Sequence, residues 1–191
     1  MIRKIWMMAI IFSACSSSNS SNDQDLEASQ IPEGAIIQDY EEIPGLQRVI
    51  LSSGDVTIGE GDFLNGLKHG SWTTYDNQGK VTSITTYLNG KKQGVSLTFD
   101  NVGYIESKAY YHNDQLDGEY LTYKRRTISE RKNYTNGQLN GSLQKFYPDG
   151  TLMEESYYVN NQIDGIARWY DQKGNLLIEY TYDMGELVEG Q

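Results

Sequence analysis

Few side chains in this sequence are suited to catalysis or metal binding. The chain has one cysteine and two histidines among its 191 residues. A single cysteine excludes an intramolecular disulfide and any zinc or iron–sulfur cluster built on cysteines. His69 and His112 fall in different predicted turns, so we expect both to be solvated. The sequence therefore predicts neither a metal site nor another cofactor.

Acidic residues offer two further kinds of chemistry. Residues 76–79 (DNQG) and 171–174 (DQKG) are faintly similar to calcium loops, but they lack alternating carboxylates and a closing Glu, so turn chemistry explains them better. Glu154 and Glu155, or Asp114 and Asp117, would be needed as a carboxylate pair for glycoside hydrolysis. Adjacent acids on a strand point to opposite faces, so we expect a protein that is not an enzyme.

A basic cluster at residues 124–126 is the sharpest charge feature of a chain whose formal net charge is −10. It is either a solvated turn or a contact for an anionic group such as a lipopolysaccharide phosphate, an acidic peptide or an anionic lipid headgroup. The overall acidity argues against nucleic-acid binding, which depends on Lys and Arg. Tyr and Trp are favoured at protein interfaces, so Trp169 and Tyr170 are a second candidate for contact with a partner. The candidate residues are Lys124, Arg125, Arg126, Arg131, Lys132, Trp169 and Tyr170.

Cys15 has a different chemistry. Arg3 and Lys4 precede an apolar run over residues 5–12, which is too short to span a bilayer because spanning takes about 20 residues. Residues 12–15 (FSAC) resemble a bacterial lipobox, with Phe where Leu is usual. The resemblance implies a signal peptide over 1–14, cleavage before Cys15 and lipidation of its thiol. Ordinary secretion with a free Cys15 is the alternative.

The segment that follows Cys15 is polar and low in complexity. Ser- and Asn-rich sequence buries too little apolar surface to order itself, so residues 15–30 are expected to be a flexible tether from the lipidated cysteine. We therefore expect a membrane-anchored lipoprotein of the bacterial cell envelope, at the outer rather than the inner membrane.

The rest of the chain repeats with a period of about 24 residues. Aromatic residues that precede a turn recur at spacings of 24, 24, 23, 24 and 24. A glycine follows seven residues after each of the first five, and a second aromatic follows twelve residues after. Three of these glycines, Gly94, Gly118 and Gly141, are expected to have positive φ between strands. The first ladder is Phe63, Tyr87, Tyr111, Tyr134, Tyr158 and Tyr182, and the second is Tyr75, Phe99, Tyr123, Phe146 and Tyr170.

Each repeat predicts two strands and two turns. Residues 71–75 and 81–87 are rich in β-branched and aromatic side chains and are separated by a Gly-containing turn. Asn-Gly then recurs at 65–66, 89–90 and 136–137, a strong hairpin signal. We predict an all-β fold, a single extended, twisted antiparallel meander of tandem hairpin repeats without helices after residue 30.

The pattern Tyr-x-Asn-Gly-x-x-x-Gly followed by an aromatic and then Gly-x-aliphatic resembles the MORN-repeat-variant family, whose bacterial members are often labelled antitoxin-like. The resemblance implies one hairpin per repeat. It covers residues 63–191 as five repeats and a truncated sixth, and residues 31–62 are interpreted as a degenerate capping repeat. Asp114 and Asn161 depart from the pattern where Gly would close the turn, and the third repeat is shortened.

Two functions follow as hypotheses. The first is a non-catalytic, β-repeat binding or scaffold module of the envelope, which presents its sheet to an unidentified protein or glycan. The second is an antitoxin-like or immunity protein that neutralises a toxin partner. Lethality of a gene deletion only in the presence of a neighbouring toxin gene would favour the second.

Overall fold

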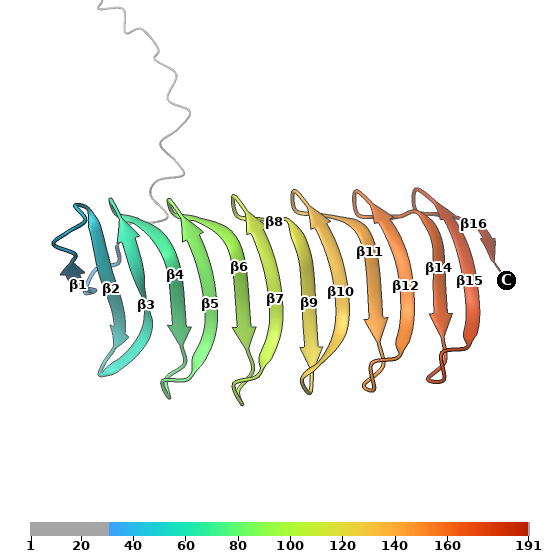
Figure 1. Ribbon diagram of the computed structural model, residues 1–191, viewed down its shortest axis with the longest axis horizontal. Coiled ribbons are helices and arrows are strands. Elements are labelled where there is room, and N and C mark those ends of the chain that lie inside the picture. Colours follow the sequence, from blue (N-terminus) through green and yellow to red (C-terminus); the bar gives the residue numbers. More distant parts are fainter. Residues whose placement is uncertain (1–30, 191) are drawn as a thin grey trace, which may run out of the picture.

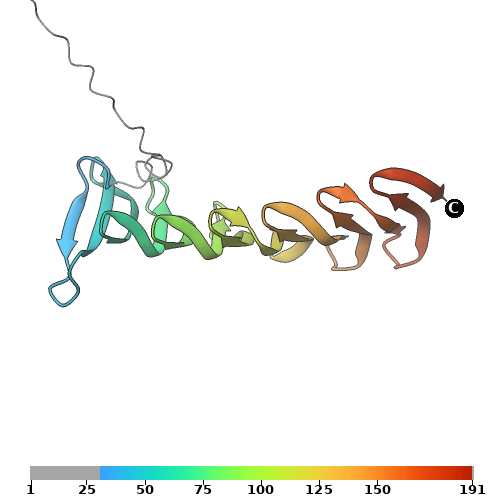
Figure 2. The same cartoon turned by 90° about the horizontal axis from the view of Figure 1, so that it is seen from above.

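The computed structural model describes residues 31–190, so the predicted signal peptide, Cys15 and the tether lie outside the described residues. Those described residues form one open sheet in which successive strands are neighbours and every pairing is antiparallel (Figure 1). Seen from above, the hairpins are open curls and no second layer covers the sheet (Figure 2). The predicted all-β meander is therefore confirmed. The strands are β1 (Ile36–Asp39), β2 (Leu46–Ser53), β3 (Val56–Leu64), β4 (Leu67–Tyr75), β5 (Val81–Leu88), β6 (Lys91–Phe99), β7 (Ile105–His112), β8 (Gln115–Leu116), β9 (Gly118–Lys124), β10 (Thr127–Thr135), β11 (Gln138–Phe146), β12 (Leu152–Val159), β13 (Gln162–Ile163), β14 (Gly165–Tyr170), β15 (Leu176–Asp183) and β16 (Glu186–Gly190).

The turns lie along two edges of this sheet, and we name the edges by their turn residues. The asparagine edge has two-residue turns, in which both residues have positive φ. This geometry matches the twist of the flanking strands and suits Asn and Gly. The aspartate edge has longer turns except at the third repeat. The asparagine edge comprises 65–66, 89–90, 113–114, 136–137, 160–161 and 184–185, and the aspartate edge comprises 76–79, 100–103, 125–126, 147–150 and 171–174.

Successive turns of the asparagine edge are hydrogen-bonded to one another. The amide of Gly90 donates to the carbonyl of Lys68 at 2.8 Å, one repeat earlier, and the amide of Gly137 donates to Leu116 in the same way at 2.8 Å. Asp114 and Asn161, which depart from the sequence pattern, keep this backbone bond and add a second. Each side-chain Oδ1 accepts from a backbone amide of the previous repeat at 2.7 Å, from Lys92 and Leu139 respectively. The departures therefore strengthen the link between repeats.

A β-bulge follows each turn of the asparagine edge, and it explains the glycine seven residues after each ladder aromatic. Gly70, Gly94, Gly118, Gly141 and Gly165 all have positive φ, between 70° and 116°. A Cβ at Gly118 would lie 3.2 Å from the Cβ of Tyr110. The positive φ predicted at Gly94, Gly118 and Gly141 is confirmed.

The two aromatic ladders lie on opposite faces, because side chains alternate along a strand. We call inner the face with the first ladder, and outer the face with the second. A row of small or apolar side chains along the middle of the inner face is buried. These buried residues lie one after another across the strands and do not form a compact cluster. The row consists of Trp72, Thr85, Ala109, Leu143, Ser156 and Ala167.

At the N-terminal end the chain covers its own inner face. Val49, Phe63 and Trp72 form a buried cluster, and Ile31 and Ala35 pack against it. The rings of Phe63 and Trp72 meet edge-on with centroids 5.6 Å apart, a favourable geometry for an aromatic pair. Further along the sheet the inner face lacks such a cover among the described residues.

Candidate binding groove and basic tip

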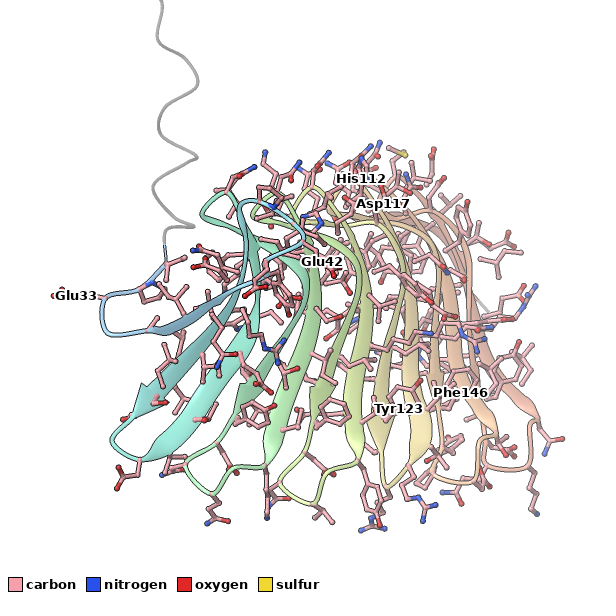
Figure 3. The ribbon with its side chains drawn as sticks, turned by 60° about the vertical axis from the view of Figure 1, so that its left-hand side comes forward. Glu33, Glu42, His112, Asp117, Tyr123 and Phe146 are labelled. Atoms are coloured by element: carbon pink, nitrogen blue, oxygen red, sulfur yellow. The ribbon has the colours of Figure 1, made fainter. Side chains whose placement is uncertain are left out.

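The inner face is hollowed in the middle of the sheet. A groove of about 940 Å³ crosses the strands from β6 to β12 and reaches the aspartate edge. Two residues of the outer ladder, Tyr123 and Phe146, border the groove only where it reaches this edge. Figure 3 shows them toward one end of the strands, while His112 and Asp117 lie at the other. The lining residues include Thr98, Glu106, Ser107, Tyr120, Thr122, Tyr123, Lys124, Ser129, Glu130, Lys145, Phe146, Tyr147, Pro148 and Met153.

Paired hydroxyl groups form the floor of this groove. The hydroxyl oxygens of Thr98 and Ser107 lie 2.7 Å apart across β6 and β7. Those of Thr122 and Ser129 lie 3.0 Å apart across β9 and β10. The Thr98–Ser107 pair uses one of its two protons internally, so the other proton and the remaining lone pairs can serve a ligand. In the second pair Ser129 also donates to the carbonyl of Thr122 at 3.2 Å, so that pair offers a ligand lone pairs only. The floor is thus a row of donors and acceptors beside the ring of Tyr120.

Toward the C-terminal side of the groove, ion pairs replace the hydroxyl pairs. Lys145 Nζ lies 2.9 Å from Glu154 Oε2, and Lys132 Nζ lies 2.9 Å from Glu130 Oε2. Burial opposes the charge of Lys132, but the hydrogen bond and attraction of Glu130 raise the pKa of this lysine above its ordinary value. These cations are therefore neutralised within the sheet.

The basic tip, Lys124 to Arg126, borders the groove where it reaches the aspartate edge. Here the turn has only two residues, and Arg125 and Arg126 have φ values of 50° and 74°. Positive φ is uncommon for residues other than Gly, Asn and Asp. Among residues 31–190, no carboxylate lies within ion-pair distance of the three side chains. The tip is therefore an unneutralised cationic site.

The other candidate residues do not join the tip. Arg131 and Lys132 are neighbours on β10 and point to opposite faces. Arg131 lies 3.1 Å from Glu119 on the neighbouring strand β9, and Lys132 is paired with Glu130 of its own strand. Trp169 and Tyr170 likewise point to opposite faces of β14, so they do not form one aromatic surface. Tyr170 instead donates to Glu155 at 2.7 Å.

The histidines and the turn aspartates do not line the groove. The expectation that both histidines are solvated is wrong for His69, whose Nδ1 is buried and finds no partner within residues 31–190. Exposed His112 instead contacts Gln93 through Nδ1 at 3.1 Å. Asp76 Oδ1 accepts from the amides of Gln78 and Lys80, which is the geometry of a self-bonded turn rather than of a calcium loop.

Metal-binding clusters and membrane-spanning helices are both absent from residues 31–190. Within this range no group of three or more His, Cys, Asp or Glu side chains is arranged to hold a metal ion. The same residues include no helix with the length and hydrophobicity needed to cross a membrane.

The hydroxyl floor was not predicted, although the repeat pattern marks it. Thr74, Thr98 and Thr122 each precede an aromatic of the second ladder by one residue. A recurring Thr in front of an outward-facing ring must point inward, because side chains alternate. The groove itself left no such trace, since it depends on the curvature of the sheet.

Comparison with known proteins bears on the repeats. Residues 68–89, 139–160 and 163–184 match the family model described as MORN repeat variant. Each match covers one hairpin of the sheet and ends at the first residue of the asparagine-edge turn that follows it. No curated protein matches the chain significantly. The three matches confirm the predicted resemblance to MORN-variant repeats at these three segments of the sheet.

Proposed function

We propose that the protein is a non-catalytic lipoprotein of the bacterial envelope that binds a protein or glycan partner on the inner face of its repeat sheet. MORN-variant repeats support the coarser part of this proposal, because such arrays serve as binding and scaffold modules. The lipobox-like sequence that ends at Cys15 supports the anchor. Cleavage before Cys15 would remove Arg3 and Lys4 and would leave a more acidic mature chain.

The groove is the observation on which the binding role depends. Its floor offers hydroxyl groups and its walls offer Tyr120 and Tyr147, a combination of polar and aromatic groups typical of ligand sites. At the N-terminal end the same face is filled by Ile31 and Ala35. The inner face can thus be covered by a chain segment, and the middle of it is left open for a partner.

The test is a pull-down from crosslinked envelopes with matched variants. Ser107→Arg places a long side chain in the groove, whereas Ser71→Arg places the same side chain on the exposed outer face of β4. We expect the first variant to lose the partners recovered by the wild-type chain and the second to retain them. Equal recovery by both variants, with unchanged thermal stability, would contradict binding in the groove.

The anchor has its own test. Cys15→Ser should prevent lipidation and processing, so the chain should no longer appear in the membrane fraction at its mature mass. A mature, membrane-bound Cys15→Ser protein would contradict the lipoprotein assignment. The outer membrane is the expected location, which fractionation of the two membranes would check.

A further inference from the structure

The basic tip holds a conformation that its residues disfavour. Arg125 and Arg126 both have positive φ, a region that residues other than glycine disfavour. The same chain forms two-residue turns with Asn-Gly at 65–66, 89–90 and 136–137. Asn-Gly, which suits this type of turn, therefore occurs elsewhere in the protein, and the tip has two arginines in its place. Strained residues at an exposed site are a reason to look for a function there.

A small cleft lies directly beside the tip. It has a volume of about 300 Å³, and its walls include Ile128, Phe146, Tyr147 and Pro148. The hydroxyl of Tyr147 donates to the carbonyl of Tyr170 at 2.9 Å, which fixes the position of its ring. The cleft therefore has largely apolar walls, one of which is held in place by this hydrogen bond, and cationic side chains lie at its end.

Positive charge at the tip is available to a ligand. Lys132, Lys145 and Arg131 are each paired with a glutamate, whereas the tip side chains have no carboxylate within ion-pair distance among residues 31–190. The guanidinium carbon of Arg126 lies 5.1 Å from the ring centroid of Tyr104. Stacking on a ring leaves the in-plane N–H donors of a guanidinium free for an acceptor.

We propose that the tip binds a phosphomonoester, with the phosphate at Lys124 to Arg126 and the organic group against the walls of the cleft. A compact dianion suits adjacent guanidinium groups, which bind phosphate oxygens with paired, charge-assisted hydrogen bonds. The organic group would pack against Tyr147 and Pro148, as a sugar ring or the glycerol of a lipid does.

An acidic peptide fits the tip less well. Extended peptides gain much of their affinity by pairing with the free edge of a sheet. Both β9 and β10 lie inside the sheet, with β7 and β11 on their other sides, so neither strand offers a peptide the free edge of a sheet. The strongly acidic chain would also repel an acidic protein at longer range.

The experiment is calorimetric titration of the full chain in neutral detergent micelles. Glucose 1-phosphate and inorganic phosphate are the soluble probes, and micelles containing phosphatidic acid or phosphatidylglycerol are the lipid probes. We expect glucose 1-phosphate or phosphatidic acid to bind, and the stronger of the two to identify a soluble or a lipid source. Phosphatidylglycerol, a phosphodiester with a single charge, should bind more weakly than phosphatidic acid.

Two matched variants make the result specific. Arg125→Asn with Arg126→Gly keeps the two-residue turn and should weaken binding about tenfold or more. Lys91→Asn with Lys173→Asn removes the same charge from exposed positions elsewhere and should have little effect. Equal losses in both variants would reduce the effect to net charge and overturn the site.

Three other outcomes would also overturn the proposal. These are binding of none of the phosphates, equal affinity for inorganic phosphate and glucose 1-phosphate, and binding of a glutamate-rich peptide in their place. The tip is separate from the hydroxyl floor, so partner binding that survives or fails with Ser107→Arg leaves this site to be judged on its own titration.

Discussion

The two edges of the sheet are joined in different ways. At the asparagine edge, each turn donates a backbone hydrogen bond to the previous repeat, as Gly90 does to Lys68 and Gly185 to Ile163, both at 2.8 Å. At the aspartate edge, each turn closes on itself, as Gly79 does with Asp76 and Gly174 with Asp171, both at 3.0 Å. Backbone hydrogen bonds therefore link the turns of one edge along the array, whereas at the other edge they stay within each turn and only side chains, such as Lys80 to Asn101 and Tyr147 to Tyr170, reach the next repeat.

This difference explains where the sequence is free to change. Replacing a residue of the asparagine edge alters two repeats, and at Asp114 and Asn161 the replacement for Gly supplies a new bond to the neighbouring repeat. A shortened turn at the aspartate edge leaves the internal backbone hydrogen bonds of the neighbouring turns in place. The basic tip and the cleft lie at this second edge, where a local change does not propagate.

The largest expected effect is a loss of stability when a glycine near the asparagine edge is replaced, compared with a glycine of the aspartate edge. Gly118→Val should destabilise the protein by about 2–4 kcal/mol, because strain at φ +113° adds to crowding against Tyr110. Gly150→Val, at φ +92° on the aspartate edge, meets open space and should cost only about 1–2 kcal/mol. Urea midpoints measure both. Thr122→Val, a strand position, serves as the control and should cost less than either. Equal midpoints for the two glycine variants would remove the distinction.

The next effect has the opposite sign. Arg125→Asn with Arg126→Gly should stabilise the protein by about 1 kcal/mol, because the pair then suits the positive φ values of 50° and 74°. Thermal melting of the two proteins at one salt concentration provides the measurement. Destabilisation would mean that the arginines stabilise the fold, which would weaken the argument for a ligand at the tip.

A third prediction separates conformation from hydrogen bonding at the asparagine edge. Asn161→Ala loses the bond to the Leu139 amide and places Ala at φ 69°, so it should cost about 1–2 kcal/mol. Asn161→Gly loses only the bond and should cost less than half as much. Hydrogen exchange at the Leu139 amide should quicken in both variants. If the two variants have equal stability, backbone strain is not a factor at this turn.

The smallest effect is on pH dependence. Backbone amides hold the pKa values of Asp76 and Asp149 below their usual range, and the side chain and backbone of Asn175 do so for Asp171. A lowered pKa in the folded state stabilises it above the unfolded pKa of about 3.9, and this stabilisation is lost as the pH falls through the folded value.

Acid should therefore loosen the aspartate edge, while the asparagines of the other edge do not titrate. Asp76→Asn with Asp171→Asn keeps an acceptor oxygen at each turn and removes the titrating groups. The fall in urea midpoint between neutral and acidic pH should be smaller in this double variant than in the wild-type protein. An identical fall in both proteins would show that these aspartates do not contribute.

The sequence by itself determined the repeat, its strands and its turns. Asn at 65, 89 and 136 and the glycines at 94, 118 and 141 predicted conformations that the backbone adopts, because turn geometry depends on neighbouring residues alone. The all-β meander followed for the same reason, since each hairpin pairs with the next one along the chain.

Only the tertiary structure decided which of these residues share a surface. Arg131 and Lys132 are adjacent in sequence and lie on opposite faces, whereas Thr98 and Ser129 are 31 positions apart and line one groove. Alternation gives the face of each residue once the bulges are placed, and the bulges shift the register within every repeat. The groove and its cleft arise from the curvature of the whole sheet, which sums small twists over many strands and so cannot be found in any single repeat.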